Sequence, residues 1–346
     1  MIQRPPSWQV IAIWGSWSLC ALSPAACRHK DLTAQDSGVT EGDADADSDS
    51  DSDTDADADG DTDADSDTDT DADGDTDDTG DPGPTRWASV VANFSLACGI
   101  TVDSELRCWG LSIYGLTDPP SGTFSQVELG AAHACGLRSE GTIVCWGSSA
   151  SDRLDAPAGT FAQLATSSNG AIALDVNGNL HCWSTLCPNS DSIPPGPYVS
   201  INAGGGYHYV GRLVDGTWVC FMSQGGTDYG QCALPDQDFV EIRAGGTHTC
   251  GIRPDGTLEC WGYSEQNVTM APEGSYSSLS TGAEYSCAIS SETGELTCWG
   301  TYYPDISPSG SYIQVDAGND FACALSSVGA VTCWGSNVYG ELDVPP

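Results

Sequence analysis

The stretch from Ala244 to Gly262, AGGTHTCGIRPDGTLECWG, decides the fold of this chain. Just before it, Phe239–Arg243 alternates apolar and polar side chains, as a half-buried strand does. Thr247–Arg253 runs back after a glycine turn, and Thr257–Trp261 follows a second turn at Pro-Asp-Gly. A three-residue loop with Gly last suits a type I turn closed by a left-handed residue. The stretch therefore predicts antiparallel strands joined by tight turns.

The Cys-Trp pair of this stretch marks a repeat. It recurs at Cys108-Trp109, Cys145-Trp146, Cys182-Trp183, Cys260-Trp261, Cys298-Trp299 and Cys333-Trp334, and Cys220-Phe221 fills the remaining gap. An aromatic residue opens each module, near positions 87, 124, 161, 198, 239, 276 and 312. One module of about 37 residues forms a sheet with two apolar faces, and such sheets stack around an axis. We therefore predict an all-β, seven-bladed β-propeller over residues 87–346.

Cysteines in five modules occupy facing positions of the predicted hairpin, at a separation that a disulfide can span. The expected hairpin disulfides are Cys98–Cys108, Cys135–Cys145, Cys250–Cys260, Cys287–Cys298 and Cys323–Cys333. Modules three and four have Ile172 and Val210 at the first cysteine position, and each carries a substitute cysteine downstream. We expect the pairs Cys182–Cys187 and Cys220–Cys232 there. Exchange between these two modules stays open from sequence alone.

The repeat resembles that of the regulator of chromosome condensation family. The resemblance rests on Ala244–Gly262 and on Trp334–Leu342, WGSNVYGEL, and it covers Trp87 to Pro346. It implies a seven-bladed propeller. The short modules are closer in length to those of bacterial relatives, which include a secreted propeller that inhibits β-lactamases. The family's chromatin binding and nucleotide exchange are not expected here, because the domain lacks a basic surface.

The charge of the chain argues against a nucleic-acid-binding protein, and its cysteine content favours a protein of an oxidising compartment. The chain has 10 Lys+Arg against 49 Asp+Glu, a net charge of −39. Affinity for a phosphate backbone comes from basic side chains that displace counterions, so we expect no nucleic-acid partner. The chain has 16 cysteines and a single lysine, Lys30. Cysteines this dense are usually bridged in an oxidising compartment.

Residues 1–26 are typical of an export signal, with an apolar run at Val10–Leu22 and small residues before Cys27. The run is too short to cross a bilayer, which takes about 20 apolar residues. The segment resembles a bacterial lipoprotein signal, in which Cys27 becomes lipidated. Cleavage after Ala25 or Ala26 without a lipid is the alternative. We expect an exported envelope or outer-membrane lipoprotein, attached to the membrane only through its lipid.

Residues 27–86 form an acidic linker in which every odd position from Asp43 to Asp77 is Asp. Such a segment cannot bury enough apolar surface to fold, so we predict a disordered tether. Two stretches imitate the start of a calcium loop, at Asp55, Asp57 and Asp59 and at Asp69, Asp71 and Asp73. Both lack the glutamate at the twelfth position, where Ser66 and Gly80 stand. Calcium binding is therefore the weaker interpretation, and no other cofactor is expected.

Candidate catalytic residues are sparse. His133, His208 and His248 occupy equivalent module positions, so a propeller would distribute them around its ring instead of gathering them on one metal. Nucleophile elbows, phosphate-binding glycine loops and H-E-x-x-H helices do not occur. The sequence thus predicts no catalytic site, no metal site and no enzyme.

Recognition is expected where the modules differ, which is the stretch after each Trp-Gly. Variable loops on a rigid scaffold are the usual place for binding residues, and aromatic side chains offer large contact areas there. The candidates are Arg153, Met222, Tyr229, Tyr263, Tyr302 and Tyr303. Tyr114 and Tyr339 precede repeat glycines and are expected to cover blade edges instead.

We therefore expect a monomeric, non-enzymatic binding propeller at the cell envelope that recognises a protein or a glycan. An inhibitor of a secreted or periplasmic hydrolase is the alternative, and a polysaccharide-acting enzyme is a distant third. An inhibitor would abolish the activity of a hydrolase in a stable complex, whereas an adhesion module would not.

Overall fold

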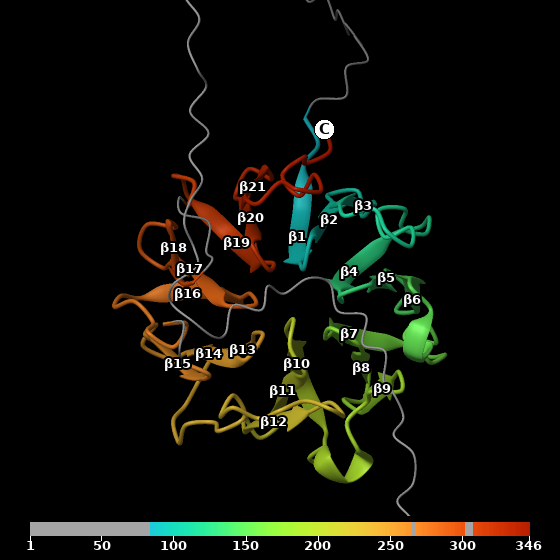
Figure 1. The fold of residues 1–346 in the computed structure, drawn as a ribbon, viewed down its shortest axis with the longest axis vertical. Coiled ribbons are helices and arrows are strands. Elements are labelled where there is room, and N and C mark those ends of the chain that lie inside the picture. Colours follow the sequence, from blue (N-terminus) through green and yellow to red (C-terminus); the bar gives the residue numbers. More distant parts are fainter. Residues whose placement is uncertain (1–83, 265–266, 302–306) are drawn as a thin grey trace, which may run out of the picture. The chain divides into compact units, whose positions relative to one another are not determined.

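The computed structural model describes residues 84–264, 267–301 and 307–346. The predicted export signal, Cys27, the acidic linker and both calcium stretches lie outside these residues. The described chain forms seven three-stranded antiparallel sheets. Figure 1 shows them as seven blades around a central axis, which confirms the predicted propeller.

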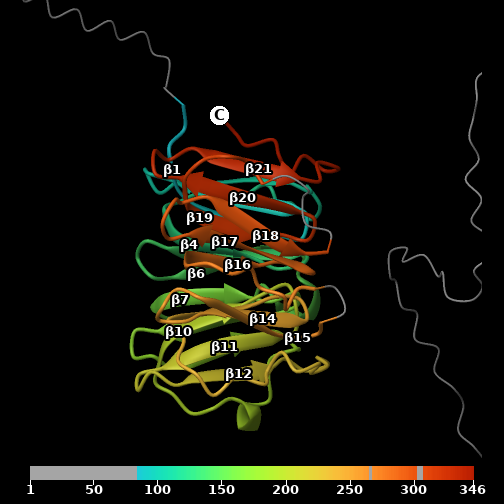
Figure 2. The same ribbon diagram turned by 90° about the vertical axis from the view of Figure 1, so that its left-hand side faces the viewer.

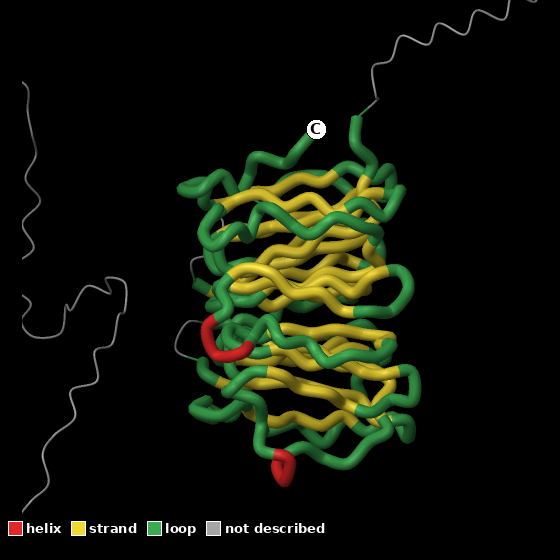
Figure 3. The backbone as a smooth tube through the Cα atoms, turned by 90° about the vertical axis from the view of Figure 1, so that its right-hand side faces the viewer, coloured by secondary structure: helices red, strands yellow, loops and turns green. Residues whose placement is uncertain are grey.

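Each blade uses three consecutive strands, ordered from the axis outward. Blades 1 to 4 are β1 (Trp87–Asn93), β2 (Leu96–Thr101), β3 (Leu106–Gly110); β4 (Phe124–Leu129), β5 (His133–Arg138), β6 (Ile143–Gly147); β7 (Phe161–Thr166), β8 (Ala171–Asp175), β9 (Leu180–Trp183); and β10 (Tyr198–Ala203), β11 (His208–Leu213), β12 (Trp218–Met222). Blades 5 to 7 are β13 (Glu241–Ala244), β14 (His248–Ile252), β15 (Leu258–Gly262); β16 (Tyr276–Thr281), β17 (Tyr285–Ser290), β18 (Leu296–Gly300); and β19 (Tyr312–Ala317), β20 (Phe321–Ser326), β21 (Val331–Gly335). Figure 2 shows the same ring from the side, with the strands running roughly horizontally from β1 and β21 at the top to β12 at the bottom. Two short 3-10 turns, η1 (Ala150–Asp152) and η2 (Ser190–Ser192), lie in loops outside the sheets (Figure 3).

The hairpin register follows from the turn. Gly256 has φ +86°, the left-handed conformation that the Pro-Asp-Gly turn requires, and Cys250 faces Cys260 across β14 and β15. A second glycine makes room inside the blade. A Cβ on Gly251 would lie 2.5 Å from Cδ1 of Phe239, so this position in the middle strand accepts the aromatic ring that opens the module. The glycines of the module therefore serve two purposes: one permits the tight turn, and the other makes room for the aromatic ring.

The hydrophobic core lies in the seams, meaning the contacts between consecutive blades. Leu96 and Ile100 of blade 1 pack with Phe124 and Trp146 of blade 2 in one buried cluster. Phe321 of blade 7 belongs to a cluster with residues of blade 1. Burial of apolar surface therefore stabilises the ring one seam at a time.

Glutamine side chains tie inner strands of adjacent blades. Gln163 of β7 donates to the carbonyl of Ile201 at 2.9 Å and accepts from its amide at 3.0 Å. Gln126 makes the same pair of bonds with Leu164. Gln314 makes them with Val90, at 2.7 Å to its carbonyl and 3.2 Å from its amide. The last pair closes the ring between blade 7 and blade 1.

Seven disulfides link all 14 cysteines of the propeller, and every predicted pair is confirmed. The five hairpin disulfides join Cα atoms 4.0 Å apart. Cys182–Cys187 and Cys220–Cys232 join Cα atoms at 5.9 and 5.2 Å. Seven disulfides suit an oxidising, extracellular environment. Over the described ranges, no helix is long and apolar enough to cross a membrane.

Candidate binding surface

The loops after Trp-Gly lie at the outer rim of the ring, and part of each is fixed by the next blade (Figure 1). Tryptophan indoles donate to loop carbonyls of the preceding blade: Trp146 to Leu116, Trp183 to Arg153, Trp261 to Gln231, Trp299 to Val268 and Trp109 to Glu341, at 2.9 to 3.1 Å. The Trp of the repeat is thus a seam residue. The remaining loop residues are the ones that can vary.

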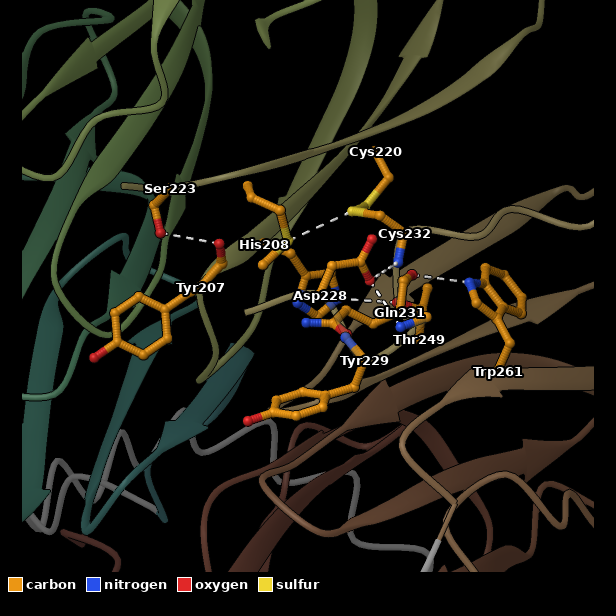
Figure 4. Close-up of a disulfide and its surroundings, with 12 residues drawn as sticks. Tyr207, His208, Cys220, Ser223, Asp228, Tyr229, Gln231, Cys232, Thr249 and Trp261 are labelled. Atoms are coloured by element: carbon orange, nitrogen blue, oxygen red, sulfur yellow. Dashed lines mark hydrogen bonds between the residues drawn. A yellow bond between two sulfur atoms is a disulfide. The ribbon is translucent and has the colours of Figure 1, made fainter. Parts of the chain in front are cut away.

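In blade 4 the variable loop is closed by its own disulfide (Figure 4). Cys220 ends the hairpin and Cys232 lies past the loop, so the bond encircles Met222 to Gln231. Met222 is half-buried, with its sulfur 3.7 Å from the sulfur of Cys232. Asp228 accepts hydrogen bonds from the amides of Gly230 at 2.8 Å and Cys232 at 3.4 Å. The disulfide and these bonds hold the loop in one conformation.

The loop presents Tyr229, whose side chain is 53 % exposed. Its amide donates to Oε1 of Gln231 at 2.5 Å, and Gln231 in turn holds Trp261 of blade 5. The Tyr229 ring meets the ring of Tyr263, from the corresponding loop of blade 5, edge to face with centroids 5.6 Å apart. Tyr263 is half-buried. We call Met222–Cys232 together with Tyr263 the loop site.

Tyr229 stands at the same repeat position as Tyr114 and Tyr339. The amide of Tyr339 donates to Glu341 at 2.7 Å as that of Tyr229 does to Gln231, and each tyrosine precedes a glycine with positive φ. Tyr114 is 66 % exposed and Tyr339 53 %. These two side chains do not cover a blade edge by burial. Among the three, the ring partner in the next blade distinguishes Tyr229.

The other predicted binding residues lie elsewhere. Arg153 is buried, and its Nη2 donates to Oδ1 of Asn169 at 3.3 Å, while Asn169 donates to the hydroxyl of Tyr207 at 3.2 Å. Burial lowers the pKa of Arg153. Tyr302 and Tyr303 lie outside the described residues. The structure therefore brings Met222, Tyr229 and Tyr263 together. It places Arg153 in the seam between blades 2 and 3.

The three histidines lie in seams, in different blades. His208 shares a hydrogen bond of 2.9 Å with Thr249, and His248 one of 2.8 Å with Ser286. Burial lowers the pKa of His208 to about 4 and that of His248 to about 3. The pKa of His133 is lowered to about 3, by burial and by the charge of Arg153. These side chains are neutral at pH 7, and the part of the chain that the structure describes has no group of three His, Cys, Asp or Glu placed to hold a metal.

The axial channel contains charged residues that were not among the binding residues predicted from the sequence. Glu128, Arg243 and Asp316 come from the inner strands of blades 2, 5 and 7 and line one cavity of about 150 Å³. Their position in the repeat could have predicted them, because each is the fifth residue counted from the aromatic that opens its module. That position alternates with buried ones and therefore faces the axis.

The sequence profile of the regulator of chromosome condensation (RCC1) repeat matches residues 124–152 and 312–341, which lie in blades 2 and 7. The other blades repeat the same three-stranded sheet, and all of them except blade 4, which has Phe221, repeat the Trp. The chain is built from RCC1-type repeats.

Solved structures with a similar fold include plant receptor ectodomains. The entire ectodomain of the receptor kinase CR4 from Physcomitrella patens is 25 % identical, with a TM-score of 0.63, and the match covers 73 % of this chain and 74 % of that chain. The CRINKLY WD40 ectodomain of the Arabidopsis thaliana receptor kinase ACR4 is 20 % identical, with a TM-score of 0.62, covering 75 % and 98 %. Prp20p from Saccharomyces cerevisiae, described with its binding properties to Gsp1p and histones, is 16 % identical, with a TM-score of 0.56, covering 68 % and 81 %. These likenesses establish the fold of the RCC1-type domain.

Proposed function

We propose that this chain is a non-enzymatic, exported binding protein that recognises a protein or glycan partner through the loop site. The observation that carries the proposal is the disulfide-closed loop of blade 4, which holds an exposed Tyr229 against Tyr263 of blade 5. Aromatic side chains on a fixed loop provide contact area without a large cost in conformational entropy. RCC1-type propellers serve in general as binding proteins, and the fold offers loops on a rigid ring for this use.

The substitute disulfide gives the loop site its fixed shape. In five blades the disulfide lies inside the hairpin, where it does nothing for the loop that follows. In blade 4 the disulfide has moved onto the loop, although Val210 and Cys220 still face each other in the hairpin. The loop also reaches the neighbouring blade, where the amide of Gln224 donates to the carbonyl of Leu186 at 3.1 Å. A prearranged loop reduces the ordering cost of binding.

We do not propose for this chain the partners with which Prp20p is described. Between Trp87 and Pro346 the basic side chains are six arginines and no lysine. Of these, Arg243 and Arg253 pair with Glu241 and Glu259, and Arg153 is buried. A nucleic acid, whose phosphates need basic side chains, is therefore not the proposed ligand. An extracellular protein or a glycan fits the seven disulfides.

The test uses the exported, disulfide-bonded chain, immobilised and probed with solubilised envelope proteins and with a glycan array. Tyr229→Ala/Tyr263→Ala should weaken capture of the partner by a few kcal/mol, as loss of aromatic anchors does. Tyr339→Ala is the matched control, because Tyr339 has the same 53 % exposure and the same repeat position but lies in blade 7. Equal loss in the control and the double variant would disprove the loop site.

We also propose that the chain is held at the cell envelope by a lipid on Cys27. The support is the small-residue cleavage site before Cys27 and the parity of the cysteines, since 14 are bonded in the propeller and Cys20 leaves with the signal. The mature protein should fractionate with membranes and incorporate labelled fatty acid. Cys27→Ser should release it in soluble form. A soluble wild type with an unmodified N-terminus at Ala26 or Cys27 would contradict the anchor.

A further inference from the structure

The axial channel holds charged groups that the binding role of the outer loops does not use. Its cavity, of about 150 Å³, is lined by the inner strands and by Gly204 and Gly205 in the turn after β10. A water molecule takes about 30 Å³ of liquid volume, so the cavity has room for roughly five waters or one compact organic molecule. The wall is mostly polar, and three charged side chains determine its character.

Two carboxyl groups lie on one side of the channel. Glu128 and Asp316 come from blades 2 and 7, which flank blade 1. Asp316 is held in place, because one carboxylate oxygen accepts from the amide of Ala92 at 2.7 Å and the other from the hydroxyl of Ser280 at 2.8 Å. Glu128 accepts from Nε2 of Gln126 at 2.8 Å through Oε1. Its Oε2 accepts no hydrogen bond from any residue that the structure describes.

The positive group lies across the axis, in blade 5. Arg243 donates from Nε to Glu241 at 2.6 Å, which fixes the guanidinium. Its two Nη groups have no hydrogen-bond partner and no carboxylate within 4.0 Å among the described residues beyond that pair. A fork of N–H donors on one wall thus faces two carboxyl groups on the other.

One further polar atom in the cavity wall is unsatisfied. The hydroxyl of Thr166 lies at the end of β7, in a residue that is 2 % exposed, and it makes no hydrogen bond within the described ranges. A buried hydroxyl without a partner is costly.

Charge and hydrogen-bond complementarity indicate which class of small molecule the channel would bind. The free N–H fork of Arg243 matches a carboxylate, and the unpaired Oε2 of Glu128, beside the carboxylate of Asp316, matches an ammonium group. A lone anion would meet two carboxyl groups, and a lone metal ion would meet Arg243 with too few ligands. We propose that the axial channel binds a small free α-amino acid, with its carboxylate on Arg243 and its ammonium group between Glu128 and Asp316.

Binding of the amino acid is coupled to a proton. The pKa of Glu128 is raised to about 8, because burial, together with the charge of Asp316, outweighs the opposing effects of Gln126 and Arg243. Burial also raises the pKa of Asp316. Glu241 is the other ionisable group beside Arg243, and the residues that blades 3, 4 and 6 contribute to this wall carry no ionisable side chain. An empty channel at pH 7 therefore keeps Glu128 protonated, and an arriving ammonium group expels that proton.

Calorimetric titration of the exported chain with glycine and with alanine tests the proposal. At pH 7, titrations in two buffers of different ionisation enthalpy should reveal proton release, and affinity should rise about fivefold from pH 7 to pH 8 as Glu128 loses its proton. Glu128→Gln should remove both the proton release and the pH dependence. Absence of binding heat at millimolar glycine and alanine would overturn the proposal.

Ligand analogues test the two ends on the unaltered protein, which avoids any fold loss from Arg243→Gln. Acetate, methylamine and glycinamide should each bind at least tenfold more weakly than glycine. Acetate that binds as well as glycine would show a plain anion site and contradict the proposal. Tyr229→Ala/Tyr263→Ala should leave glycine binding unchanged, so failure of the channel proposal and failure of the loop site are separate results.

Discussion

Blades 3 and 4 differ from the other five in where their disulfides lie. In the five, the disulfide joins facing residues of a buried hairpin, such as Cys250 and Cys260. In blades 3 and 4 the facing partner is Ile172 or Val210, and the second cysteine lies in the outer loop. The sheets keep the same strand order in all seven blades. The hairpin therefore does not depend on the disulfide for its register.

This difference shows what a disulfide does in each place. Inside the hairpin it adds stability to a structure that packing already specifies. On the outer loop it confines a segment that is mostly exposed between Gln224 and Tyr229. Blade 4 gains the fixed Tyr229 by this change. The two kinds of disulfide should respond differently to removal.

The largest effect should come from losing a hairpin disulfide. Cys250→Ala/Cys260→Ala should lower the free energy of unfolding by about 2 to 3 kcal/mol, measured by urea denaturation, because it removes a loop constraint and a buried contact. Cys220→Ser/Cys232→Ser should cost less in global unfolding but open Met222–Gln231 to limited proteolysis. Protection of that loop from protease in the second variant would show that packing alone fixes it.

Acid should weaken the seams into blades 5 and 6. His208 and His248 have pKa values lowered by burial to about 4 and about 3, below the 6.5 of an exposed histidine. The unfolded chain takes up these protons first, so stability falls as pH drops from 6.5 toward 4, by up to about 1.4 kcal/mol per unit for each histidine. The raised pKa of Glu128 acts oppositely: its contribution is present below pH 4.5 and lost as pH rises through about 8. His248→Gln should therefore flatten the slope of denaturation midpoint against pH between 6.5 and 4.5, and an unchanged slope would contradict a neutral seam histidine.

Blade 3 can be converted to the majority pattern. Ile172 and Cys182 face each other across β8 and β9. Ile172→Cys/Cys187→Ala should form the hairpin disulfide between positions 172 and 182, at a cost of about 1 kcal/mol for the lost apolar side chain. Non-reducing peptide mapping gives the pairing. Free thiols at both positions would show that blade 3 no longer accepts the hairpin bond.

The smallest effect concerns the seam between blades 2 and 3. Thr249 and Ser286, which bond His208 and His248, each face the Trp of their blade, and Ala171 holds that place in blade 3. Both ring nitrogens of His133 consequently have no partner in the described structure. Ala171→Ser should supply one and raise the free energy of unfolding by about 1 kcal/mol, seen as a higher melting temperature. A lower melting temperature would mean that the seam has no room for the hydroxyl.

Much of the architecture was predictable because its causes are local. Hairpin turns, strand alternation and cysteines ten or eleven residues apart act within one module, so Cys135–Cys145 and Cys287–Cys298 followed from spacing alone. The substitutes Cys187 and Cys232 were also found by spacing, because each lies within 12 residues of its partner. Seven copies of the pattern then fixed the number of blades.

The sequence by itself determined the modules, their strands and their disulfides, since each depends on residues that are neighbours along the chain. Only the tertiary structure decided what meets across seams and across the axis. Tyr229 and Tyr263 touch because loops of blades 4 and 5 converge, and Glu128, Arg243 and Asp316 share a cavity because closure of the ring brings three distant strands to one axis. Closure itself, through Gln314 on Val90 and Trp109 on Glu341, joins residues more than 200 positions apart. Such contacts depend on the rotation between blades, which no single module encodes.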